Sequence, residues 1–465
     1  MVFSSNTFLF LFLPFVLAIY FNPFVRSRKF RNTFLFLASL VFYAWGEPVY
    51  WALMLLSIFV NWIFGMEISK KDDKRRIKRI EILAIIYNLF FLFVFKYLDF
   101  TLQNIKHLTG INFPMHKFSL PIGISFYTFQ AISYVVDVAR GNAKAADSFL
   151  DVGLYISCFP QLVAGPIVRY ETVADEIHNR QETSEGFYEG LTRFVYGLAK
   201  KVVIANNVAQ VADKAFSMAG QSAGLAWLGA IAYTLQIYFD FSGYSDMAIG
   251  LGKIFGFHYL ENFNYPYISK SVTEFWHRWH ISLSTWFRDY VYFPLGGSRV
   301  KTVARHIFNL GIVWLLTGIW HGANWTFILW GMIYFAVQIF EKYVLKEKAG
   351  TSIFGWIYTM LVVIFCWVLF RSNSIHQAKV YIKAMLGIGV TGAGDCTAIG
   401  LLRDYWVYFA AGIAASFPIA PALRKKLSGK AFGKISYVAV TCALFIFTVS
   451  CMVTNSYNPF IYFNF

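Results

Sequence analysis

Three segments of the sequence hold most of the residues whose side chains could do chemistry. In the first, residues 236–247, the side chains of Gln236, Asp240, Ser242 and Asp246 interrupt an otherwise apolar run. On a helix, Gln236 and Asp240 share one face, and Ser242 and Asp246 share a neighbouring one. Carboxylates at membrane depth usually mark a functional site or an ion path. A hydrogen-bond network that holds helices together would use the same residues, so both interpretations stay open.

The second segment, residues 274–290, is rich in histidine, tryptophan and arginine. Its spacing predicts a helix on which His277, His280 and Ser284 stack along one face. Tryptophan and arginine suit a membrane interface, but interfacial anchoring does not explain the histidines. A His-x-x-His pair with no glutamate between the histidines is a weak metal signal, and no third ligand stands nearby. We therefore expect no metal site here.

The third segment ends a long apolar run with His321, which lies between Gly318 and Gly322. Glycines remove side-chain bulk and let another part of the chain or a substrate approach closely. Burial disfavours the charged imidazolium, so His321 would be neutral and available as a base. A histidine that only satisfies a hydrogen bond in the core fits the same pattern.

The composition fixes the environment in which these segments must work. The chain has 465 residues, of which 57% are hydrophobic, 20% aromatic and only 14% charged, against about 25% charged in ordinary soluble domains. A soluble protein of this length would lack charges to cover its surface. Disordered and fibrous proteins are excluded as well, because the chain is apolar throughout and its glycines and prolines are not periodic. The sequence predicts a polytopic membrane protein.

The net charge of +16 lies in short basic clusters between apolar runs, such as residues 26–31 and 70–79. Such clusters are typical of cytoplasmic loops that face anionic lipid, and we expect no nucleic-acid partner. The cluster at 26–31 follows the first apolar run and places the N-terminus outside. The five cysteines form no CxxC pair and predict neither a disulfide framework nor a metal cluster.

The elements that would position the three segments are apolar helices. We treat residues 1–465 as one membrane domain. Residues 121–293 carry glycine, proline and polar residues inside apolar runs. At membrane depth, such residues are tolerated only where they are buried in protein or line a cavity. The runs that predict membrane helices are 8–24, 33–45, 51–66, 80–95, 225–238, 308–320, 326–340, 353–370, 406–417 and 437–453.

Motifs along the whole chain resemble those of the membrane-bound O-acyltransferase family. Within that family the sequence is similar to the bacterial alginate O-acetyltransferase branch. One departure is His277, where arginine is expected. The matching motifs are Phe3-Ser4-Ser5, Pro160 to Ile167, Tyr238 to Asp246, Phe275 to Ser284, Arg288 to Tyr290, Pro294 to Gly297, Trp320-His321-Gly322 and Phe460 to Phe463.

This resemblance implies an all-α fold with roughly 11–13 transmembrane helices, plus re-entrant or interfacial helices, around a central tunnel. It implies that His321 is the essential histidine and His280 a second family histidine. The candidates for a supporting polar shell are Gln161, Asp240, Asp246, Ser284 and Asn324.

The resemblance also implies an activity. An acetyl group would pass from acetyl-coenzyme A, or another acyl thioester or acyl carrier on the cytosolic side, across the bacterial cytoplasmic membrane to an extracytoplasmic polysaccharide. No bound cofactor is expected, and an extracytoplasmic acetyltransferase of the SGNH-hydrolase type would be a partner. Two alternative acyl transfers are D-alanine to teichoic acid and acetyl to peptidoglycan. A transporter is a further alternative, against which the sequence shows no duplicated pair of interrupted helices.

Overall fold

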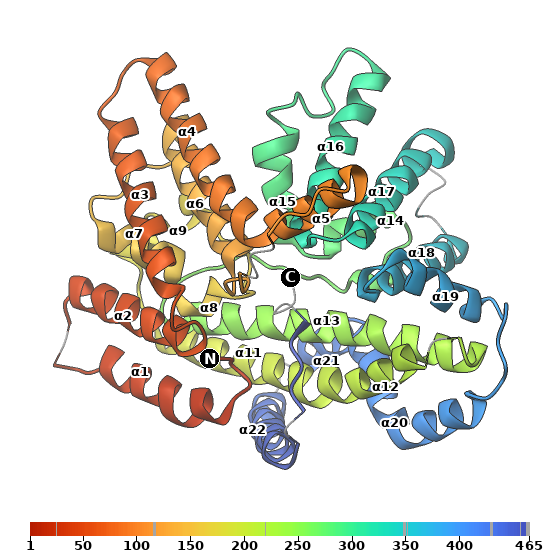
Figure 1. Ribbon diagram of the computed structural model, residues 1–465. Coiled ribbons are helices and arrows are strands. Elements are labelled where there is room, and N and C mark those ends of the chain that lie inside the picture. The colour runs from red at the N-terminus through yellow and green to blue at the C-terminus, as the bar shows by residue number, and fades with distance from the viewer. Residues whose placement is uncertain are drawn as a thin grey trace. The chain divides into compact units, whose positions relative to one another are not determined.

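The computed structural model in Figure 1 describes residues 1–24, 26–114, 118–218, 220–346, 350, 352–427, 431–455 and 457–461, and every regular element in these ranges is helical. This confirms the expected all-α class. Tyr462 and Phe463 of the closing motif lie outside the described residues. The chain divides into two compact units, residues 1–194 with 245–260, and residues 195–244 with 261–465.

Helices of the first unit come from the N-terminal part of the chain. They are η1 (Phe8–Phe12), α1 (Leu13–Tyr20), α2 (Arg28–Gly46), α3 (Trp51–Ser69), α4 (Lys74–Leu92), η2 (Phe93–Tyr97), α5 (Leu98–Thr109), α6 (Ile124–Arg140), α7 (Phe149–Ser157), α8 (Phe159–Leu162), α9 (Tyr170–Val173) and α10 (Glu176–Asn179). Two further helices contribute residues to both units, α11 (Ser184–Ala199) and α13 (Ala223–Ile254).

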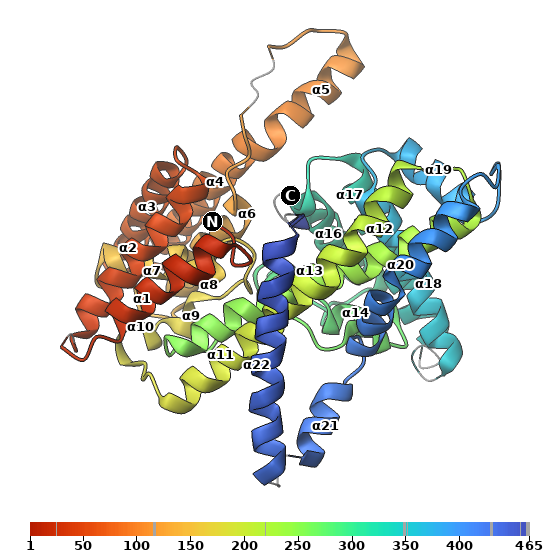
Figure 2. The same ribbon diagram turned by 90° about the horizontal axis from the view of Figure 1, so that it is seen from below.

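Helices of the second unit follow later in the chain. They are η3 (Lys200–Ala205), α12 (Asn206–Ser217), η4 (Pro266–Ile268), α14 (Val272–Arg278), α15 (Ile281–Phe287), η5 (Arg288–Tyr292), α16 (Val303–His321), α17 (Trp325–Phe340), η6 (Glu341–Leu345), α18 (Ile353–Arg371), α19 (Ile375–Met385), α20 (Asp395–Ala415), α21 (Ile419–Leu427) and α22 (Ala431–Thr454). Figure 2 shows the same helices from below.

The first unit shows how polar residues are accommodated inside these helices. Helices α3 and α4 pack against each other, and Asn61 on α3 meets Asn88 on α4. Each amide donates to the other's side-chain oxygen, at 3.0 and 2.7 Å. Both residues are buried, so the pair satisfies polar atoms that apolar neighbours could not. Two of the apolar runs expected to form membrane helices, 33–45 and 51–66, lie in α2, which ends at Gly46, and in α3, which begins at Trp51.

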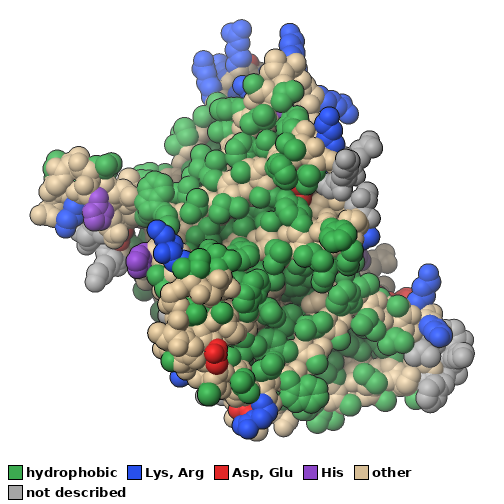
Figure 3. Space-filling view, turned by 90° about the vertical axis from the view of Figure 1, so that its right-hand side faces the viewer, with side chains coloured by type: hydrophobic (Ala, Val, Ile, Leu, Met, Phe, Trp, Pro, Cys, Tyr) green, Lys and Arg blue, Asp and Glu red, His purple; other side chains and the backbone are tan. Residues whose placement is uncertain are grey.

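Six helical stretches among the described residues are long and apolar enough to cross a membrane: Trp51–Ser69, Lys74–Thr109, Val303–His321, Trp325–Leu345, Ile353–Arg371 and Ile435–Thr454. The protein is therefore a helical membrane protein. The apolar runs predicted to be membrane helices include shorter segments than these six. The number of transmembrane helices and the central tunnel that the resemblance implies stay predictions. In the view of Figure 3, hydrophobic side chains cover most of the drawn face, and Lys and Arg side chains gather at its margins.

Glycines let α16 and α17 pack closely in the second unit. A Cβ added to Gly318 would lie 2.6 Å from the carbonyl oxygen of Phe327, and one added to Gly331 would lie 2.5 Å from that of Trp314. The neighbouring atoms are backbone and cannot move aside cheaply. The close approach that the sequence predicts at Gly318 is therefore made by α17, which fixes the end of α16 where His321 lies.

We predict that Gly318→Ala destabilises the protein by about 1–3 kcal/mol, because the added methyl group overpacks the contact between α16 and α17. Gly400→Ala on α20 is the matched control, since a Cβ there would meet nothing within 4 Å. Thermal unfolding midpoints of the detergent-solubilised proteins would compare the two. Equal midpoints for both variants would contradict the packing argument.

Candidate functional site

The helix predicted across residues 274–290 is interrupted at His280, so the expected stacking of His277, His280 and Ser284 on one helical face is wrong. α14 ends at Arg278, Trp279 is extended, and α15 begins at Ile281. His280 itself has a φ of 44°, in the left-handed region. A left-handed conformation costs a non-glycine residue roughly 1–2 kcal/mol, so tertiary contacts must hold this break in place.

Contacts at the start of α14 and directly after the break restrain this segment. The buried carboxylate of Glu341 accepts hydrogen bonds from the backbone N–H groups of Val272 and Thr273, at 2.6 and 2.9 Å, and from the Thr273 hydroxyl at 2.7 Å. Glu341 thus caps the start of α14 with a negative charge, which the helix N-terminus favours. After the break, the side chain of Asn262 accepts a hydrogen bond from the backbone N–H of Ser282, at 3.2 Å.

The imidazole of His280 is enclosed on every side. Its exposed fraction is 0%, the ring of Phe241 packs edge-on at 4.6 Å between centroids, and the ring of Trp320 lies at 6.0 Å. Nδ1 lies 3.1 Å from Oδ1 of Asn262, while Nε2 has no hydrogen-bond partner among the described residues. Burial lowers the pKa of His280 to about 3, so this histidine is neutral at physiological pH.

His321 is the last residue of α16 and is also buried, with 4% of its surface exposed. Aromatic rings surround its imidazole: Trp330 of α17 and Phe370 of α18 both lie 5.0 Å away between centroids, and Trp320 lies at 4.9 Å. An apolar wall of this kind disfavours a charged imidazolium. The two histidines share Trp320 as a neighbour, so the structure brings His280 and His321 to the same aromatic cluster.

Asn324 and Ser284 lie in the same unit and make local hydrogen bonds. The Asn324 side chain caps α17 by accepting from the Thr326 backbone N–H at 3.1 Å, and its amide donates to the carbonyl of Asn373 at 2.9 Å. Asn324 thereby fixes the turn that follows His321. The hydroxyl of Ser284 donates to the carbonyl of Trp276 at 3.3 Å, which ties α15 to α14.

Asp240 forms a buried ion pair. Its carboxylate lies 2.5 Å from the ammonium of Lys201, and the two side chains are 1% and 3% exposed. The other carboxylate oxygen accepts the backbone N–H of Ile461 at 2.8 Å, and Lys201 donates to the carbonyl of Pro459. The pair therefore anchors the C-terminal residues 457–461 within the second unit, which is the role the structure gives Asp240.

The two remaining predicted residues, Asp246 and Gln161, lie in the first unit. The carboxylate of Asp246 accepts two hydrogen bonds from the guanidinium of Arg193, at 3.0 and 2.9 Å. The buried amide of Gln161 donates to the carbonyl of Tyr155. Both contacts support the packing of this unit.

Three residues that the sequence interpretation missed are Asn262, Lys201 and Glu341. Each acts on a partner remote in the chain: Asn262 is 18 residues from His280, and Glu341 is 69 residues from Val272. Spacing within one helix could not reveal such pairs. Of the three, Lys201 has the clearest signal in the sequence, because a lysine in an apolar run needs a carboxylate partner such as Asp240.

Within the described parts of the chain, no three histidine, cysteine or acidic side chains gather in a way that could hold a metal ion. The prediction that no cofactor is bound stays a prediction. The imidazoles of His280 and His321 are the acid–base groups of this cluster, and they are suited to proton transfer.

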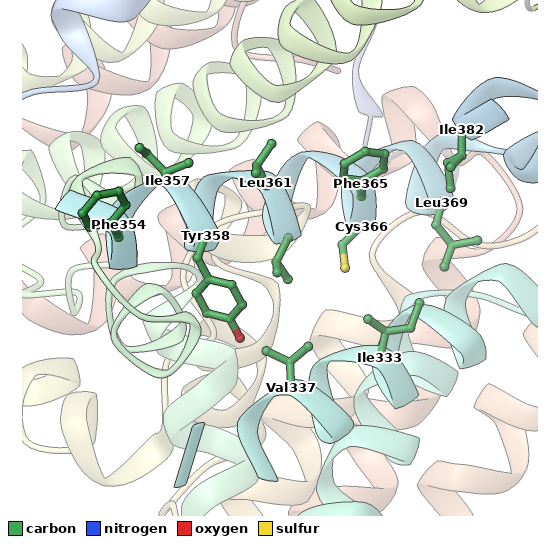
Figure 4. Close-up of a pocket in the computed structure, with 11 residues that line it drawn as sticks. Ile333, Val337, Phe354, Ile357, Tyr358, Leu361, Phe365, Cys366, Leu369 and Ile382 are labelled. Atoms are coloured by element: carbon green, nitrogen blue, oxygen red, sulfur yellow. The ribbon is translucent and has the colours of Figure 1, made fainter. Parts of the chain in front are cut away.

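A separate apolar groove lies between α17 and α18 (Figure 4). Its volume is about 530 Å³, and its lining includes Ile333 and Val337 of α17 and Cys366 and Leu369 of α18. Phe370 of α18, which contacts His321, is not among the residues that line the groove, and neither histidine is. The groove therefore does not hold the candidate chemistry.

These features define a helical membrane protein with two histidines buried in one aromatic cluster. The sequence model of the membrane-bound O-acyltransferase family matches residues 140–376. A relative named "Probable alginate O-acetylase AlgI" from Pseudomonas syringae pv. tomato is 44% identical over 84% of this chain and 76% of its own. A protein of the same name from Azotobacter vinelandii is 39% identical over the full length of both chains.

A third relative, "Peptidoglycan O-acetyltransferase" from Helicobacter pylori, is 34% identical over 83% of this chain and 80% of its own. The chain belongs to the membrane-bound O-acyltransferase family and is an O-acyltransferase. The resemblance seen in the sequence motifs is confirmed.

We predict that Asp240→Asn destabilises the protein by about 3–5 kcal/mol, because it leaves the buried Lys201 ammonium without a counter-charge. The double variant Lys201→Met with Asp240→Leu should recover most of that loss, since a buried ion pair replaced by apolar residues is often neutral for stability. Thermal unfolding in detergent is the measurement. A double variant no more stable than Asp240→Asn would refute the ion-pair account.

Asp404→Asn serves as the control for a lost carboxylate. Its partner Arg403 is exposed, and exposed pairs contribute only about 0–1 kcal/mol. Its unfolding midpoint should stay close to that of the wild type.

Proposed function

We propose that this O-acyltransferase takes an acetyl group from a cytosolic acyl thioester, acetyl-coenzyme A or an acyl carrier, and delivers it across the bacterial cytoplasmic membrane. The acceptor is a hydroxyl group of an extracytoplasmic, alginate-like polysaccharide. The observation that carries the proposal is His321, a histidine enclosed by Trp320, Trp330 and Phe370 at the end of a membrane helix. An imidazole positioned beside the acceptor is the general base that transfer to a hydroxyl needs.

Acyl transfer from a thioester to a hydroxyl needs few catalytic groups other than a general base. A thioester is already an activated acyl donor, so the acceptor oxygen attacks the acyl carbon while its proton moves to the imidazole of His321. A C–O bond forms, the C–S bond breaks, and the proton is passed on to the leaving thiolate. A positioned general base contributes about 10²–10⁴-fold to such a step. The aromatic wall around His321 also keeps water, a competing acceptor, away from the acyl group.

The identity of the acceptor rests on the relatives. Proteins named alginate O-acetylases are 39–44% identical to this chain over most of its length, whereas the peptidoglycan O-acetyltransferase is 34% identical. A protein named "Teichoic acid D-alanyltransferase" from Bacillus subtilis is 31% identical over 57% of this chain. We therefore favour an alginate-like acceptor and retain peptidoglycan as the alternative. The proposal includes an extracytoplasmic acetyltransferase partner that completes the transfer.

We predict that His321→Ala lowers ester-linked acetate on the surface polysaccharide by about 10²–10⁴-fold, the contribution of a general base. Cells deleted for the gene and complemented at equal membrane levels with wild type or variant would be compared by release of acetate with mild alkali. His376→Ala is the matched control, because this histidine is exposed at the start of α19.

Acetylation by His321→Ala at the wild-type level would overturn the assignment of the base. If the deletion strain and the complemented strain carry equal surface esters, the polysaccharide acceptor is wrong. Measuring acetate on purified peptidoglycan from the same cells distinguishes the alternative acceptor.

A further inference from the structure

The side chain of Asn262 holds the ring of His280 through a shared oxygen. Asn262 is 1% exposed, and its Oδ1 contacts Nδ1 of His280 at 3.1 Å, the backbone nitrogen of Ser282 at 3.2 Å and the Ser282 hydroxyl at 2.9 Å. All three contacts converge on one atom of the amide. The chemistry of these partners determines which nitrogen of His280 carries the proton.

The contact with the backbone of Ser282 identifies the Asn262 atom. A backbone N–H can only donate, so the amide atom it meets has to be the carbonyl oxygen and not the NH₂ group. The same oxygen can only accept from His280, so the 3.1 Å contact assigns the proton to Nδ1. The Ser282 hydroxyl also lies 3.4 Å from Nδ1, but it donates to Asn262 at the shorter distance of 2.9 Å. The assignment thus follows from a donor whose hydrogen is fixed by the backbone, and does not depend on a choice of amide orientation.

A neutral imidazole carries one N–H, so protonation at Nδ1 leaves Nε2 as a lone-pair acceptor. Rotating the ring by 180° would place a C–H group against Asn262 and lose the hydrogen bond. The rings of Phe241 and Trp320 also confine the imidazole. His280 is therefore held in one tautomer and one orientation.

Two costs are concentrated at this residue. Nε2 is buried without a hydrogen-bond partner among the described residues, and leaving such a group unsatisfied is unfavourable. The backbone of His280 is left-handed, an outlier of the kind that clusters at functional sites. Both features are expected at a site where a substrate group supplies the missing hydrogen-bond partner of Nε2.

We propose that Asn262 is a positioning residue that fixes His280 as the Nδ1–H tautomer, so that Nε2 accepts a hydrogen bond from a substrate hydroxyl. This inference rests on the proposed transfer to a hydroxyl acceptor. It gives His280 a defined role: Nε2 binds and orients the O–H group, and it has no proton with which to polarise the acyl carbonyl. Proton removal remains with His321.

The tautomer can be measured directly. In full-length protein labelled with ¹⁵N-histidine, the ¹⁵N chemical shifts of His280 report which nitrogen is protonated, and the His280 signals are those lost in His280→Ala. We expect Nδ1 to be protonated in the wild type and in Asn262→Asp, whose carboxylate keeps the acceptor oxygen. An Nε2–H tautomer in the wild type would overturn the proposal.

Asn262→Leu removes the acceptor and should release the tautomer. We expect kcat for acetyl transfer to fall at least about tenfold, since a histidine held in the wrong tautomer loses more than that in serine proteases. Asn262→Asp should recover much of the loss. Asn309→Leu is the control: it removes another buried amide, bonded to the carbonyl of Gly297, and should leave the His280 tautomer unchanged.

The outcomes separate this inference from the function on which it rests. If Asn262→Leu alters the tautomer but acetylates with the wild-type kcat, or if Asn262→Asp restores nothing, the positioning role is wrong. If Asn262→Leu does not fold, the wild-type spectrum and the Asn262→Asp rate still decide the question. If the wild type transfers no acetyl group although His280 has the expected tautomer, the proposed function fails and the tautomer assignment stands.

Discussion

The structure depends on one constraint: a polar group enclosed among apolar helices must find its partner within the protein. Lys201 pairs with Asp240, Asn61 pairs with Asn88, and Glu341 takes up the free N–H groups at the start of α14. Each partnership joins residues of two different helices. In an apolar chain with only 14% charged residues, these contacts specify which helices meet, while van der Waals packing at Gly318 and Gly331 sets how closely they meet.

The same constraint explains the hydrogen bonding of His280. The aromatic cluster that surrounds the two histidines provides almost no hydrogen-bonding capacity, so one nitrogen of His280 is satisfied by Asn262 and the other is left for a ligand. Glu341 holds the start of α14, and Asn262 holds the backbone directly after the break in the helix. A rigid support of this kind is what a site needs if a histidine nitrogen is to meet a hydroxyl group in one geometry.

The sequence predicted much of the fold because apolar runs and turn residues act locally. Neighbouring residues are enough to predict the separate helices α2 and α3 and the helix α16 that ends at His321. They also predict that Asp240 is buried. The break at His280 could not be predicted, because helical spacing favours continuity there and the opposing contacts come from Asn262 and Glu341. Asp240 was assigned to a supporting shell, but its partners Lys201 and Ile461 depend on tertiary packing.

The central claim is that His321 acts as the general base when an acyl group passes from a thioester to a hydroxyl. The most direct test is a reconstituted reaction. Purified protein is placed in lipid vesicles together with its extracytoplasmic acetyltransferase partner, isotope-labelled acetyl-coenzyme A and a soluble polyuronate acceptor, and alkali-labile label on the polymer is counted. The account predicts label that accumulates with the wild type and falls to background with His321→Ala. Equal labelling by both proteins would contradict it.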